Sequence, residues 1–165
     1  MAQQPKDSAG TCRGGVPVIK QFKSVSEVLD FAISREIEAH KFYVRLIEWV
    51  QRPEVAKAFE NMATDELQHR IRLEAVKSGE VCINKEEVGN LGIADAMPPV
   101  EPEVDMSYVQ ALRVAMQREK NSYRIYTNLA TIATKPEFRD MFLKLAQEEA
   151  GHKLRVEIEY DWVMS

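Results

Sequence analysis

The chain has 165 residues, of which 45% are hydrophobic and 29% are charged, and its formal net charge is −4. These values fit one soluble globular domain with a core of ordinary size. The sequence has no long run of Lys or Arg to neutralise phosphates, and no apolar run near the roughly 20 residues of a membrane span. Nucleic acid and membrane are therefore not expected as partners. The N-terminus lacks the apolar core of a secretory signal, so we expect a cytoplasmic protein.

The N-terminal segment and the two cysteines carry no recognisable chemistry. Residues 1–23 are rich in Gly, Pro and polar residues without periodicity, which predicts a flexible tail. Cys12 lies in this tail, Cys82 follows 70 residues later, and the sequence contains no C-x-x-C. We therefore expect free thiols, and neither a rubredoxin-type iron site nor a zinc ribbon.

The rest of the chain, residues 24–165, predicts an all-α four-helix bundle made of two helical hairpins. Apolar residues recur in steps of three and four over about 24–51, 53–78, 107–134 and 136–163. Ser24 and Ser107 stand as N-caps, and Pro53 and Pro136 are well placed as first helical residues. The segment 79–106 contains several Gly and Pro residues and predicts a long crossover that can run the length of a bundle.

The two hairpins are copies of one another. Adding 83 to each residue number aligns Pro53 with Pro136 without a gap, and it also aligns the stretch TDELQHRIRLE (64–74) with QEEAGHKLRVE (147–157). Both stretches contain Glu-x-x-His. Residues three apart lie on the same face of a helix, so each motif can direct a carboxylate and an imidazole to one point.

Polar side chains interrupt the apolar stripes of all four predicted helices at a common depth. At roughly 1.5 Å per residue they lie about 21–26 Å from the turn of their hairpin, so they are expected to meet in the middle of the bundle. There are six of these side chains: Glu36, Glu66, His69, Glu119, Glu149 and His152.

Such a cluster needs a compensating charge. Buried carboxylates lose several kcal/mol of hydration each and repel one another. Two divalent cations would balance the four glutamates, and mixed oxygen and imidazole ligands suit iron or manganese, with zinc as a further alternative. Any one of these residues taken alone is more often a solvated or core residue, and a repeat that has lost its metal is the alternative interpretation of the whole set.

At these six residues, and over about residues 24–162, the sequence resembles the ferritin-like di-iron carboxylate proteins, and within them the rubrerythrin-type branch. The resemblance implies two iron ions per chain. It implies that Glu66 and Glu149 bridge the metals and that Glu36 and Glu119 are terminal ligands. Each histidine of the two motifs would then cap one ion.

Several neighbours of the six residues are further candidates. The resemblance makes Tyr43 and Tyr126 candidate catalytic residues, because a tyrosine near this position in the family often hydrogen-bonds a ligand carboxylate and could carry an oxidising equivalent. Filling of the core by an aromatic ring is the alternative. His40, one turn from a glutamate, is interpreted as a rim residue rather than a seventh ligand. Asp65 and Glu148 either accept hydrogen bonds from the imidazoles or are exposed charges.

The resemblance also suggests a function. The leading hypothesis is a di-iron oxidoreductase that reduces hydrogen peroxide or dioxygen as a homodimer. No rubredoxin domain is present, so electrons would come from a separate donor such as a rubredoxin-like protein. Rubrerythrins look to carry a further Glu where this chain has Ser122, which favours a symmetric centre. The alternatives are a ferroxidase or iron-handling protein, and a non-catalytic metal-binding bundle.

Overall fold

The computed structural model describes residues 24–79 and 106–165. These residues form four α-helices, namely α1 (Val25–Trp49), α2 (Pro53–Ser78), α3 (Tyr108–Ile132) and α4 (Pro136–Met164). The helices stand at nearly the expected positions, and the all-α four-helix fold is confirmed. The predicted tail, both cysteines and nearly all of the predicted crossover lie outside the described residues. None of the four described helices is long and apolar enough to cross a membrane.

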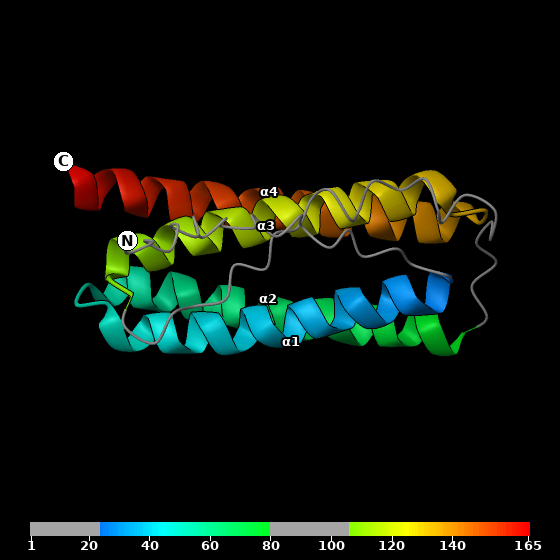
Figure 1. Ribbon diagram of the computed structural model, residues 1–165, viewed down its shortest axis with the longest axis horizontal. Helices are drawn as coiled ribbons and strands as arrows, with labels where there is room; N and C mark the ends of the chain where they lie inside the picture. Colours follow the sequence, from blue (N-terminus) through cyan, green and yellow to red (C-terminus); the bar gives the residue numbers. More distant parts are fainter. Residues whose placement is uncertain (1–23, 80–105) are drawn as a thin grey trace, which may run out of the picture.

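The helices form two antiparallel hairpins that pack on each other as two layers (Figure 1). The closest packing is within each hairpin, between α1 and α2 and between α3 and α4. Across the layers, α1 contacts α3 and α2 contacts α4. The end of α2 and the start of α3 lie at opposite ends of the bundle (Figure 1). The two hairpins therefore present equivalent helix faces to the interior.

Local sequence signals account for the helix ends. The Ser24 side chain accepts a hydrogen bond of 3.2 Å from the backbone N–H of Glu27 at the start of α1. At the start of α3, Ser107 and Gln110 form a complete capping box with bonds of 3.3 and 2.7 Å. The second helix of each hairpin begins with a proline, whose missing N–H costs nothing in the first turn.

The apolar core is divided into two clusters, one on each side of the polar layer. One cluster includes Leu29, Leu129 and Phe142, and the other includes Phe59 and Leu112. Glu36 separates the part of α1 that joins the first cluster from the part that joins the second. The polar side chains are consequently enclosed by apolar packing above and below.

The burial of a leucine side chain predicts how much stability is lost when it is replaced by alanine. Leu129 is fully buried, so Leu129→Ala should lower the free energy of unfolding by about 2–5 kcal/mol through lost burial and the cavity left behind. Leu143 is 48% exposed, and Leu143→Ala should change it by no more than about 0.5 kcal/mol. Urea unfolding followed by circular dichroism compares the two variants, and equal losses would contradict the assignment of the core.

Candidate metal centre

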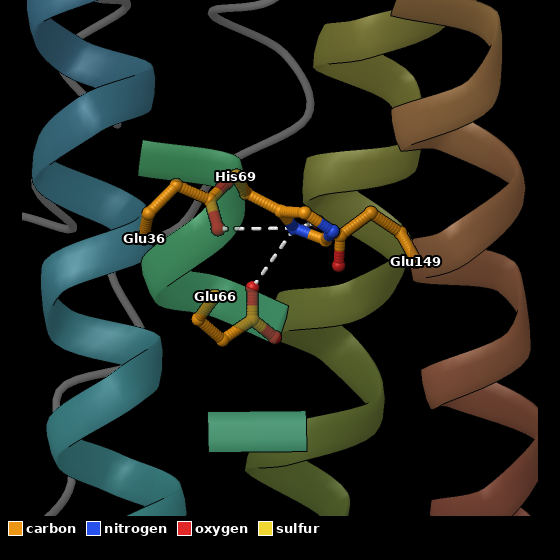
Figure 2. Close-up of side chains that lie close together, drawn as sticks. All are labelled: Glu36, Glu66, His69 and Glu149. Carbon is orange, nitrogen blue, oxygen red and sulfur yellow. Dashed lines mark ion pairs between the residues drawn. The ribbon is translucent and has the colours of Figure 1, made fainter. Parts of the chain in front are cut away.

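The structure brings the six predicted side chains together in the middle of the bundle. All four helices contribute, with a glutamate from α1 and from α3 and a Glu-x-x-His pair from α2 and from α4. Every one of the six residues is at most 4% exposed. In Figure 2 the carboxyl groups of Glu36, Glu66 and Glu149 surround the imidazole of His69.

The six residues form two overlapping groups. In each group, one potential ligand atom from every residue lies within 4.8 Å of the others. The first group contains Glu36 and His69, the second contains Glu119 and His152, and both contain Glu66 and Glu149. Two neighbouring cations could therefore be held with two shared carboxylates, one further carboxylate each and one imidazole each.

The imidazole Nδ1 atoms face the carboxylates. Nδ1 of His69 lies 2.9 Å from Glu149, 3.2 Å from Glu66 and 3.5 Å from Glu36. Nδ1 of His152 lies 3.1 Å from Glu66 and 3.8 Å from Glu149. The two rings stack with centroids 5.8 Å apart.

Several atoms in the cluster are buried without a hydrogen-bond partner, which is rare in folded proteins. They are Glu36 Oε2, Glu66 Oε2, both carboxylate oxygens of Glu149 and His69 Nδ1. The Nδ1 atom is close to three carboxylates but is not aligned for a hydrogen bond with any of them. Unpaired oxygen and imidazole nitrogen atoms that converge on one point are the donor set that a divalent transition metal requires.

The outer imidazole nitrogens are held by acidic residues of the opposite hairpin. Nε2 of His69 lies 3.0 Å from Glu148, and Nε2 of His152 lies 3.1 Å from Asp65. Both acids therefore lie within hydrogen-bond distance of an imidazole, and Asp65, whose side chain is 55% exposed, also fits the exposed-charge interpretation. A carboxylate that accepts from Nε2–H fixes the tautomer and leaves Nδ1 for a metal. Arg72, which no sequence motif singles out, forms an ion pair with Glu148 at 2.7 Å.

His40 lies outside both groups. Its Nδ1 is 2.7 Å from the carbonyl oxygen of Ala63, and this contact joins α1 to α2. The placement agrees with a rim residue and not with a seventh ligand.

The two tyrosines also bond across the hairpins. The Tyr43 hydroxyl donates to Glu119, and the Tyr126 hydroxyl donates to Glu36. Burial raises the pKa of both tyrosines well above the ordinary value, with a further contribution from the nearby carboxylates, so the phenols stay protonated and act as donors. Both rings also belong to the core clusters. Each tyrosine therefore both hydrogen-bonds a carboxylate of the cluster and fills the core with its ring.

Burial and mutual charge shift the pKa values of the cluster. Burial raises the pKa of Glu36 to about 8, and the charge of Glu66 adds to this effect. Burial and the same neighbour raise the pKa of Glu149 well above its usual range. Burial opposes protonation of His69 and His152, but the surrounding carboxylates outweigh it and raise both pKa values to about 10. For Glu66, the two imidazoles outweigh burial and lower the pKa.

The fold and the site define a helical bundle with a buried cluster of carboxylates and histidines at its middle. The family model of rubrerythrin matches residues 27–160, so the chain belongs to the rubrerythrin family. Neither the curated proteins nor the solved structures gave a match. The family and the two buried groups together indicate that the protein binds metal ions.

These pKa values predict that metal affinity rises with pH. Ligands bind metal in their deprotonated forms, but the protein alone holds protons at neutral pH on Glu36, with a pKa of about 8, and on both histidines, with pKa values of about 10. From about pH 6 to about pH 8 these groups remain largely protonated, so metal must displace their protons, and the falling proton concentration should increase the apparent affinity for Zn(II) by roughly tenfold per unit for each proton released.

Competition with a chromophoric chelator measures this affinity, and a pH indicator in weak buffer measures the proton release. An affinity that is constant or falls as the pH rises would contradict the assignment of these groups as ligands.

Proposed function

We propose that this chain holds two iron ions at the six clustered side chains and is a di-iron oxidoreductase that reduces hydrogen peroxide or dioxygen. The observation that carries the proposal is the pair of overlapping four-residue groups with two shared glutamates. Two divalent iron ions would balance the charge of the four buried carboxylates. Manganese or zinc would satisfy the same donor atoms, and iron is favoured by the family.

Each residue has a defined part in this proposal. Glu66 and Glu149, which belong to both groups, would bridge the ions, and Glu36 and Glu119 would be terminal ligands. The histidines would each bind one ion through Nδ1. When bound, the iron pair supplies the two electrons that reduce the oxidant.

Tyr43 and Tyr126 are proposed as positioning residues for this chemistry. Each phenol donates to a terminal carboxylate and so limits the rotation of that side chain. Their raised pKa values keep the proton on the phenol oxygen at neutral pH. Because the phenols reach Glu119 and Glu36 rather than the ions themselves, they act through those ligands.

Burial restricts the substrates that can reach the site. Every residue of the cluster is at most 4% exposed, and apolar clusters close the bundle on both sides. A bulky organic substrate could not touch the metals without opening the bundle, whereas peroxide and dioxygen are small enough to enter through modest fluctuations. The burial of the cluster therefore supports a small oxidant as the substrate.

After oxidation, the iron pair would require electrons from an external donor to return to its reduced state. The sequence contains two cysteines and no C-x-x-C, so this chain offers no rubredoxin-type iron site of its own. A separate rubredoxin-like protein is the proposed donor, and a homodimer is the proposed assembly on the basis of the family.

Anaerobic stopped-flow absorbance tests the oxidoreductase proposal. Protein loaded with Fe(II) should react faster with hydrogen peroxide or dioxygen than free Fe(II) does, and the oxidised iron should remain bound after gel filtration. Added reductant should then restore the starting spectrum for repeated cycles. Release of ferric iron would show a ferroxidase instead, and the absence of oxidation would show a non-catalytic metal-binding bundle.

Removal of the shared glutamates tests the ligand assignment. Glu66→Ala and Glu149→Ala should each leave fewer than two tightly bound irons per chain, because each change removes a carboxylate common to both positions. Glu60→Ala is the matched control on α2, since the Glu60 side chain is 50% exposed and pairs with Lys57 on the same helix. Metal analysis of dialysed, folded protein gives the stoichiometry. Two irons per chain in either variant would overturn the assignment.

A further inference from the structure

The two halves of the metal centre differ in how their histidines are held. Glu148, which accepts from His69, is also bound by Arg72, with both contacts made by the same carboxylate oxygen at 3.0 and 2.7 Å. The Glu148 side chain is 30% exposed. Asp65, which accepts from His152, has a side chain that is 55% exposed. His69 is thus held by a carboxylate that an arginine also binds, whereas His152 is held by a carboxylate that is exposed to solvent.

The difference coincides with a change of one methylene group in the internal repeat. Asp65 occupies the repeat position of Glu148, and Arg155 occupies that of Arg72. Arg72 pairs with Glu148, but within the described residues Arg155 forms no ion pair with the shorter Asp65. Arg155 instead lines a pocket at the end of the bundle beside Trp162. The internal repeat therefore allows the same position to be compared with and without an arginine bound to the carboxylate.

We propose that the position formed by Glu36 and His69 binds a divalent metal more tightly than the position formed by Glu119 and His152, and that Arg72 is the positioning residue responsible. The proposal rests on the two-metal site proposed above. It implies that metal enters the His69 position first and exchanges mainly at the His152 position.

Two effects of Arg72 oppose each other. Its positive charge withdraws electron density from Glu148 and so weakens the support that this carboxylate gives to His69. Its hydrogen bond also holds the carboxylate, and hence the ring, in the orientation that a metal needs. Ion pairs this exposed contribute little charge energy, whereas loss of a group that hydrogen-bonds a metal ligand typically weakens affinity by roughly 10–100-fold. Arg72 acts one contact further out, through Glu148, so the lower end of this range is expected. Orientation is therefore the larger effect.

Zn(II) is the probe, because it is diamagnetic and needs no redox activity. The chain has three histidines, so the ring signals of ¹⁵N-histidine-labelled protein can be assigned with single variants, and His40 serves as an internal reference outside the site. With one equivalent of Zn(II), the Nδ1 signal of His69 should shift while that of His152 stays largely unchanged. With two equivalents, both should shift.

Paired substitutions test the cause. Arg72→Gln should weaken the tighter position by roughly tenfold, and Arg72→Lys should recover part of the loss. Arg155→Gln is the matched control and should change neither affinity. Asp65→Glu should reach Arg155 and strengthen the His152 position by roughly tenfold, and this gain should disappear in the double variant with Arg155→Gln. Calorimetric titration of Zn(II) measures both affinities in each variant.

The outcomes separate the two proposals. If no Zn(II) binds at the cluster, both the two-metal site and the inequality are overturned. If two Zn(II) ions bind but His152 responds first, or both histidines respond together, only the inequality is overturned. Equal effects of Arg72→Gln and Arg155→Gln would also reject Arg72 as the cause. Asp65 and Arg155 are both exposed, so their variants keep the test decisive even if Arg72→Gln is less stable.

Discussion

The structure depends on the cost of placing four carboxylates and two imidazoles inside a helical bundle. Each residue is nearly or fully excluded from water, and several of their oxygen atoms have no hydrogen-bond partner. Buried charges of one sign are tolerated only when other charges or protons compensate them. In the protein alone, the raised pKa values of Glu36 and Glu149 and the protonated imidazoles provide this compensation through bound protons. A pair of divalent cations would provide it in place of those protons.

The same cluster joins the two hairpins. The tyrosine of each hairpin donates to the first-helix glutamate of the other, and the acid before each motif glutamate accepts from the histidine of the other. An isolated hairpin therefore holds three residues of one ligand group and one residue of the other, and it lacks the supporting hydrogen bonds from the opposite hairpin. These polar contacts act together with the two apolar clusters, which also draw residues from both hairpins, to hold the two halves against each other.

Sequence reasoning could predict the helices, the internal repeat and the six clustered residues, because helical periodicity sets both the face and the height of a side chain. It could not predict which neighbouring helix each side chain would reach. The partners of Tyr43 and Tyr126, and the choice between bonded and solvated roles for Asp65 and Glu148, depend on packing across the layers. The different contacts of Arg72 and Arg155 also could not be predicted, because the helical periodicity of the two repeats is the same at these positions.

Diffraction from iron-loaded crystals at wavelengths on either side of the iron absorption edge tests the central claim most directly. The account predicts two anomalous peaks between the four helices, each next to one imidazole Nδ1, with the carboxylates of Glu66 and Glu149 contacting both. An interior without anomalous density in crystals prepared with excess iron, or peaks bound only at the protein surface, would contradict it.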